Sequence, residues 1–142
     1  MTLEPAGEAD VVFGAAYEVD AAGQGLGMTE DEVLEYLDER EKQYDDRRVL
    51  PVFRRAAGGA EVVVVEGALV YIGTPACENY LGPAPDEELA RTIVEAEGPS
   101  GPNADYLFGL ADAMRAIGVG PREDPHLFEL ERLARDLLGS PP

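Results

Sequence analysis

The stretch NADYLFGLADAMRAI, residues 103–117, decides the fold class because its apolar residues repeat at helical spacing. Four residues keep the i, i+3, i+4, i+7 interval of an amphipathic helix: Leu107, Leu110, Ala111 and Met114. Asn103 is predicted to cap the start of this helix, and Gly118 to follow its end. One face of this helix must be buried against other elements.

A second helix of the same kind is predicted near the end of the chain. Its apolar residues repeat at the same interval: Leu127, Leu130, Ala134 and Leu137. Gly139 stops this helix. A shorter helix is predicted from Asp86 to about Glu97, before the Gly-Pro pair at 98–99. The C-terminal half is therefore predicted to be helical.

Three stretches in the N-terminal half have the composition of β-strands: Val11–Val19, Val49–Arg54 and Glu61–Ile72. In the second, Pro51 marks an edge or bulge position. In the third, the run Val62–Val65 predicts burial on both faces. Strands followed by helices indicate an α+β fold. A sheet of three strands leaves long unpaired edges, which is typical of part of a domain.

The net charge of −18 over 142 residues excludes several classes of partner. Nucleic acid binding depends on Lys and Arg that neutralise phosphates, so neither nucleic acid nor an anionic membrane surface is an expected partner. No apolar run approaches the length of about 18 residues that a membrane span needs. The single cysteine, Cys77, excludes an internal disulfide framework and favours a reducing compartment. His126 is the only histidine, so neither a metal site nor a Ser-His-Asp triad is indicated.

The most informative polar residue is Glu41, the last residue of YLDERE at 36–41. A helix is predicted from Glu30 to about Gln43, because TEDE at 29–32 has the pattern of a capping box. The acidic run therefore lies on a helix, where an ordinary acidic run would form a solvated face.

Glu41 departs from that pattern. At about 100° per residue, it falls on the same stripe as Leu34 and Leu37, and Asp38 lies at the edge of that stripe. A carboxylate buried in an apolar wall has a raised pKa, which suits it to take and return a proton near neutral pH. A salt bridge at the helix end is the alternative interpretation.

Three long stretches together resemble one known family. They are YLDEREKQYDDR (36–47), YIGTPACENYLGPAP (71–85) and EAEGPSGPNADYLFGLADAMRAIG (95–118), in this order and spacing. With FGAAYEV at 13–19, they are similar to the ChaC-like γ-glutamylcyclotransferases. A tyrosine three residues after the glutamate, as at Glu41, is more similar to the plant and algal members of the family than to the animal ones. The similarity runs from about Thr2 to the C-terminus.

The resemblance implies an α+β fold with a small, mostly antiparallel barrel-like sheet and flanking helices, in a single domain over residues 1–142. It implies a cytoplasmic lyase that cleaves the small molecule glutathione without metal or cofactor. The α-amine of glutathione attacks its own γ-carbonyl and releases 5-oxoproline and cysteinylglycine. Glu41 matches the catalytic acid/base of the family, Tyr44 and Tyr80 match pocket residues, and Asp38 is expected to support them. Protein partners and oligomeric state stay open.

The sequence departs from the family at its beginning. Family members begin with a strand and a Gly-Tyr-Gly-Ser-Leu loop that holds the γ-glutamyl group, and no segment here resembles it. The domain is therefore expected to lack this strand and loop, to associate through exposed apolar surface, and to cleave little glutathione by itself. One alternative is a catalytically inactive protein that keeps the scaffold as a binding module. Another is an acidic interaction module, in which Glu41 is only helix-end charge.

Overall fold

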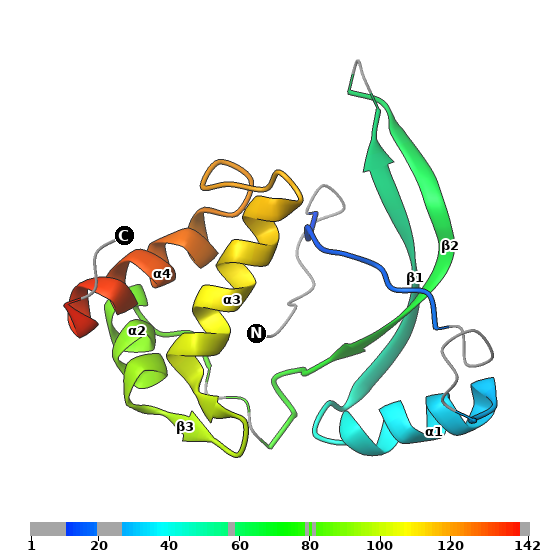
Figure 1. Ribbon diagram of the computed structural model, residues 1–142, viewed down its shortest axis with the longest axis horizontal. Coiled ribbons are helices and arrows are strands. Elements are labelled where there is room, and N and C mark those ends of the chain that lie inside the picture. The colour runs from blue at the N-terminus through cyan, green and yellow to red at the C-terminus, as the bar shows by residue number, and fades with distance from the viewer. Residues whose placement is uncertain (1–10, 20–26, 57–58, 79, 81, 140–142) are drawn as a thin grey trace. The chain divides into compact units, whose positions relative to one another are not determined.

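The computed structural model describes residues 11–19, 27–56, 59–78, 80 and 82–139. These residues form two compact units (Figure 1). The first unit draws on residues 15–82 and holds one helix and a long β-hairpin. The second unit combines residues 11–14 with 83–139 and holds three helices and a short two-stranded ribbon. Both pairs of strands are antiparallel, so the predicted α+β class is confirmed.

The helix of the first unit, α1, spans Glu30–Arg40 and begins with the predicted capping box. The Thr29 N–H donates to the Glu32 carboxylate at 2.7 Å, and the Glu32 N–H donates to the Thr29 hydroxyl at 3.3 Å. These two bonds satisfy backbone donors that the first helical turn leaves unpaired. The helix ends before Gln43, its predicted end, because the backbone leaves the helical conformation at Glu41.

The hairpin of the first unit pairs β1, Asp46–Arg55, with β2, Glu61–Ile72. The bounds of β2 agree with the prediction, and β1 is longer than predicted at both ends. The register shifts on both sides of Val52, next to Pro51. Proline has no N–H to donate to the ladder, so the predicted irregularity at Pro51 is confirmed.

The strand predicted over Val11–Val19 is wrong. Within the described residues, this segment pairs with no strand, and Val11, Val12 and Tyr17 are exposed. An extended segment without a hydrogen-bonded neighbour is not stable as a strand, whatever its composition. The described chain therefore forms two two-stranded sheets in place of one larger barrel-like sheet.

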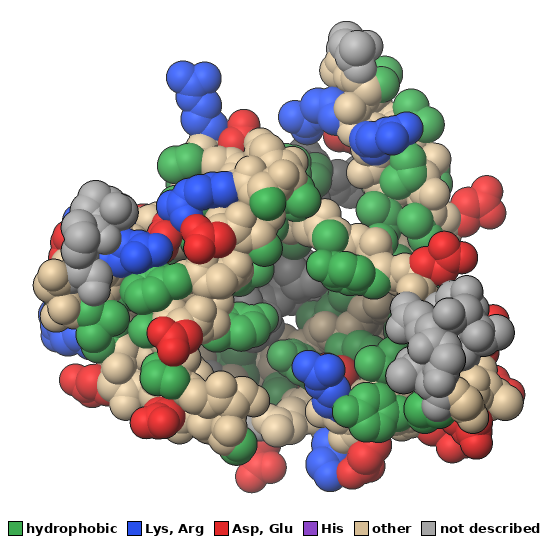
Figure 2. Space-filling view, viewed as in Figure 1, with side chains coloured by type: hydrophobic (Ala, Val, Ile, Leu, Met, Phe, Trp, Pro, Cys, Tyr) green, Lys and Arg blue, Asp and Glu red, His purple; other side chains and the backbone are tan. Residues whose placement is uncertain are grey.

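The burial predicted for Val62–Val65 is also wrong. Val62, Val63 and Val64 are each about half exposed, and Val65 is partly buried. Figure 2 shows hydrophobic side chains along the visible face of the hairpin. A valine run indicates burial only where other elements cover both faces of the strand. This part of the hairpin has no such cover among the described residues.

The second unit packs three helices around one core. The helices are α2 (Asp86–Glu95), α3 (Asn103–Ala116) and α4 (Pro125–Leu138), and the ribbon strands are β3 (Glu97–Gly98) and β4 (Gly101–Pro102). The buried core consists of Ala90, Leu107, Ala111, Met114, Val119, Leu127, Phe128, Leu130 and Ala134. The predicted helical stripes are thus mostly confirmed. Leu110 is only partly buried, and Leu137 is exposed at the end of α4.

The ends of these helices agree with the prediction at two of three positions. Gly118 and Gly139 have φ values of 81° and 64°, the left-handed conformation that glycine adopts at low cost after a helix. Asn103 is the first helical residue rather than the cap, and Pro102 occupies the capping position. The Asn103 N–H donates to the Ala96 carbonyl at 3.0 Å. That bond closes the ribbon, which sequence reasoning did not predict.

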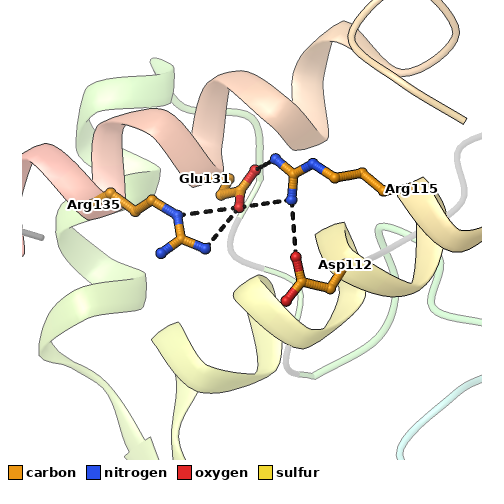
Figure 3. A network of polar contacts seen from close by, with 4 residues as sticks. All are labelled: Asp112, Arg115, Glu131 and Arg135. Carbon is orange, nitrogen blue, oxygen red and sulfur yellow. Dashed lines mark hydrogen bonds and ion pairs between the residues drawn. The ribbon is translucent and has the colours of Figure 1, made fainter. Parts of the chain in front are cut away.

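A buried carboxylate joins α3 to α4 (Figure 3). Glu131 is 4% exposed and accepts a bidentate pair of hydrogen bonds from Arg115 of α3. It also accepts two hydrogen bonds from Arg135, at 3.0 and 3.2 Å. The two guanidinium groups lie over aromatic rings, 4.9 Å from the centre of Phe128 and 4.2 Å from that of Phe108. Charge on Glu131 is therefore compensated from two sides.

The ionisation of Glu131 follows from these contacts. Burial by itself would raise the pKa of this carboxyl, but the hydrogen bonds from Arg115 and Arg135 outweigh burial and hold the pKa below its usual value. The carboxylate is therefore charged at neutral pH, and the two arginines would lose their common partner if it were removed.

We expect Glu131→Gln to lower the free energy of unfolding of the second unit by about 1.5–3 kcal/mol, because the buried carboxylate loses its charge-assisted hydrogen bonds from Arg115 and Arg135. Glu129→Gln is the matched control on the same helix. Its carboxylate pairs with Arg132 at the exposed surface, so its removal should cost at most about 1 kcal/mol. Denaturant unfolding followed by the helical circular dichroism signal measures both. Equal losses of unfolding free energy in the two variants would show that the network around Glu131 stabilises the unit no more than a surface ion pair does.

Candidate active site

The four residues predicted to form the site, Asp38, Glu41, Tyr44 and Tyr80, all lie in the first unit. Glu41 is the residue at which α1 ends. Its N–H donates to the Leu37 carbonyl at 2.8 Å, and its carbonyl accepts the Tyr44 N–H at 2.9 Å. The turn that ends the helix therefore fixes Glu41 and Tyr44 relative to each other along the backbone.

The side chain of Glu41 is half-buried rather than fully buried. It is 26% exposed, and its Oε1 lies 3.4 Å from Nε of Arg40, its neighbour in sequence. On α1 the buried residue is Val33, whereas Leu34 is 37% exposed. The packed stripe thus runs through Val33 and Leu37 to Glu41, rotated from the predicted one. Glu41 keeps its place on that stripe and stays open to solvent on one side.

Asp38 accepts two hydrogen bonds from the hairpin. The Tyr71 hydroxyl donates to Oδ1 at 2.5 Å, and Nη1 of Arg47 donates to Oδ2 at 3.1 Å. The sequence predicts a supporting role for Asp38 but does not identify its partners, so Tyr71 and Arg47 were both missed. Tyr71 could have been found from its position, because it lies at the end of a valine-rich strand, directly before Ile72 and Gly73.

The phenol of Tyr71 lies in acidic surroundings. Partial burial raises its pKa above the usual range, and the hydrogen bond to Asp38 and the negative charge of Asp38 raise it further. Arg47 acts in the opposite direction, and the charge of Glu41 adds a smaller upward effect. Tyr71 is therefore protonated at neutral pH and acts as a donor.

Two contacts hold the segment after Glu41 against the segment before Tyr80. Asp45 accepts hydrogen bonds from the Thr74 N–H at 2.7 Å and from the Thr74 hydroxyl at 2.5 Å. The Cys77 thiol donates to the Gln43 carbonyl at 2.9 Å. The loops that carry Tyr44 and Tyr80 therefore lie side by side. The Cys77 thiol is therefore occupied as a hydrogen-bond donor in this contact.

The arrangement brings together a half-buried carboxylate, a second carboxylate with two donors, and a protonated phenol. Such a set can bind an ammonium group and move a proton to or from it. In the described part of the chain, no group of three or more His, Cys, Asp or Glu is placed to hold a metal ion. His126 lies in the other unit, where its Nδ1 is 3.2 Å from Asp86 at the surface. No helix among the described residues has the length and apolar character of a membrane span.

Comparison with known proteins identifies the family. The chain matches the family of ChaC-like proteins over residues 1–137, and it belongs to that family. The resemblance predicted from YLDERE and the two later stretches is therefore confirmed.

Two curated relatives and one solved structure show how far the similarity extends. The chain is 40% identical over 135 residues to γ-glutamylcyclotransferase 2-3 of Arabidopsis thaliana, covering 90% of this chain and 65% of that protein. It is 39% identical over 121 residues to glutathione-specific γ-glutamylcyclotransferase 1 of Danio rerio, covering 84% and 56%. A crystal structure of the glutathione-specific enzyme from yeast aligns with a TM-score of 0.53 at 26% identity, covering 75% and 55%. The chain thus spans between 55% and 65% of the length of these relatives.

The contact between Asp45 and Thr74 predicts a pH dependence of stability. The Thr74 hydroxyl, and then its N–H, hold the pKa of Asp45 below its usual value. A carboxyl whose pKa is lower in the folded state stabilises the fold above its unfolded pKa of about 3.9, and this contribution is lost as the pH falls through the folded pKa.

We therefore expect Asp45→Asn to lower the Tm of the first unit at about pH 6, and expect the difference from the unaltered chain to shrink as the pH falls below about 4. Glu66→Gln, which changes an exposed carboxylate on β2, is the control for the loss of one negative charge. A Tm difference that is independent of pH, or equal in the two variants, would show that the contact with Thr74 does not stabilise the charged form.

Proposed function

We propose that this chain provides the acid/base and much of the pocket of a glutathione-specific γ-glutamylcyclotransferase, with Glu41 as the acid/base. The observation that carries the proposal is the family match over residues 1–137, together with two relatives whose names state this activity or this reaction class. The position of Glu41 at the rim of the packed face of α1 supports the same role. The proposed substrate is glutathione, and the expected compartment is the cytoplasm.

The reaction requires two proton transfers. The α-ammonium group of glutathione must lose a proton before its nitrogen can attack the γ-carbonyl carbon. A new C–N bond then closes the five-membered ring of 5-oxoproline, the amide C–N bond to cysteine breaks, and the leaving amine of cysteinylglycine must gain a proton. One carboxylate within hydrogen-bond reach can accept the first proton and return it to the leaving nitrogen.

The half-buried state of Glu41 suits this exchange. A fully buried carboxylate would need a permanent cationic partner, which would compete with the substrate ammonium. A fully exposed one would be shielded by water. Because attack within one molecule has a high effective molarity, the enzyme has chiefly to fold the substrate and to place one carboxylate correctly.

A catalytically inactive binding module is the second candidate. The ion pair between Arg40 and Glu41 favours it, because that contact gives the carboxylate a structural use at the helix end. The two candidates differ in the release of 5-oxoproline. An enzyme releases it and loses this activity when Glu41 loses its charge, whereas a binding module binds its ligand and releases none with either residue.

We expect Glu41→Gln to reduce turnover by about 10²–10⁴-fold, because the amide cannot exchange a proton. Release of 5-oxoproline is measured in the chain itself and in a fusion that adds the N-terminal segment of the Arabidopsis thaliana relative. Glu39→Gln is the matched control, since its carboxylate points to solvent and pairs with Lys42. Circular dichroism checks that both variants fold.

Turnover in the Glu41→Gln variant within a few-fold of the unaltered protein would contradict the assignment. Asp38→Asn should cost less than Glu41→Gln, because we expect Asp38 to support the site and not to exchange the proton. A larger loss of turnover in Asp38→Asn would indicate that Asp38 is the acid/base and Glu41 the supporting residue.

We also expect glutathione to be cleaved and simple γ-glutamyl dipeptides to be cleaved poorly or not at all. The support is the glutathione specificity in the names of relatives from several organisms. Steady-state kinetics with glutathione and γ-glutamyl-alanine compare the two kcat/KM values directly. Comparable values would assign the protein to cyclotransferases of broader specificity.

A further inference from the structure

One carboxylate ties the end of α1 to both strands of the hairpin. Each oxygen of Asp38 has its own donor, Tyr71 from β2 and Arg47 from β1. Arg47 and Tyr71 are directly opposite each other in the antiparallel register. Side chains of such a pair project to the same face of the sheet, so one helical carboxylate can receive both. Asp38, Arg47 and Tyr71 are called the Asp38 clamp below.

The Asp38 clamp lies within one helical turn of Glu41. Residues three apart on a helix lie on the same side, so a rotation of α1 that moves Asp38 also moves Glu41. The backbone between them is continuous helix up to the bond from the Glu41 N–H to the Leu37 carbonyl. The negative charge of Glu41 also adds a small upward effect to the pKa of the Tyr71 phenol.

Toward the Asp38 carboxylate, Tyr71 acts as a hydrogen-bond donor. Its pKa is raised by burial and by Asp38, so the phenol keeps its proton at neutral pH and cannot take one from the substrate. The Arg47 contact with Asp38 is about half exposed at both side chains, and such ion pairs hold geometry weakly. The shorter, partly buried bond from Tyr71 is therefore the stronger constraint on Asp38.

We infer that Tyr71 is a positioning residue for the proposed reaction: acting through Asp38, it holds the end of α1 on the hairpin and so sets the place of Glu41. The inference rests on the proposed function. It predicts that the phenol matters for rate even though it does not transfer the proton. A displacement of about 1 Å in a reacting group can cost about 10²-fold in rate.

We expect Tyr71→Phe to lower kcat for 5-oxoproline release about tenfold or more while KM changes little. Tyr36→Phe removes a phenol hydroxyl from the same helix, at a ring that is 61% exposed, and should leave both constants unchanged. The double variant Asp38→Asn/Tyr71→Phe should be no slower than Asp38→Asn, because Tyr71 acts through Asp38. Assays are made well below the Tm of each variant, so that loss of folded protein does not enter kcat.

A second measurement needs no turnover. Ultraviolet titration of the unaltered chain, minus that of Tyr71→Phe, gives the ionisation of Tyr71, which should occur above the usual tyrosine range. In Asp38→Asn the same difference should move to lower pH, because both the acceptor and its charge are lost.

The outcomes separate the inference from the proposed function. A titration that moves with Asp38→Asn, combined with equal kcat values for Tyr71→Phe and Tyr36→Phe, overturns the positioning role and leaves Glu41 as acid/base. Additive losses in the double variant overturn it as well. Absence of 5-oxoproline release from the unaltered chain and from the fusion contradicts the proposed function and with it the positioning role, while the titration still reports whether the Asp38 clamp exists.

Discussion

The first unit depends on the two hydrogen bonds that Asp38 accepts from opposite strands of one hairpin. A two-stranded hairpin is marginally stable by itself, and an isolated helix of this length is marginal too. Their contact at Asp38 joins the helix to the hairpin. The bonds between Asp45, which follows α1, and Thr74, which follows β2, hold the two loops at that end together. The second unit uses the opposite solution, a buried carboxylate between two arginines within an apolar helical core. In both units, a carboxylate on a helix fixes how its neighbours pack.

The helices could be predicted from the sequence because their signals are local. The capping box at Thr29 and the glycines at 118 and 139 depend on residues within one turn, and the structure has all three. The strand at Val11–Val19 could not be judged in this way, because a strand exists only if another segment pairs with it. The same limit explains Val62–Val65, whose burial depends on layers that composition does not show. The β3–β4 ribbon has two residues in each strand, too few for any alternation to appear.

Part of the candidate site could be predicted from the sequence. Helical periodicity singled out Glu41 and Asp38, and the family resemblance implied Tyr44 and Tyr80. The structure rotates the packed stripe by one residue, so that Val33 is buried and Glu41 is half-buried. Tyr71 and Arg47 were missed because their meaning lies in the register of the hairpin, which sets them opposite each other. The sequence indicates an irregularity at Pro51, but it does not say by how many residues the pairing shifts there, and the register depends on that shift.

The proposed function places the binding of glutathione at the end of α1. The most direct test is an NMR titration of the isotope-labelled Glu41→Gln variant with millimolar glutathione, since this variant should bind without turnover. The titration is made with the chain itself and with the fusion that adds the N-terminal segment of the Arabidopsis thaliana relative. We expect backbone amide shifts to concentrate at residues 41–46 and 71–78, the segments that Asp38, Asp45 and Cys77 hold together. Shifts confined to the helices of the second unit, or no shifts in either protein while both stay folded, would contradict this placement of the substrate.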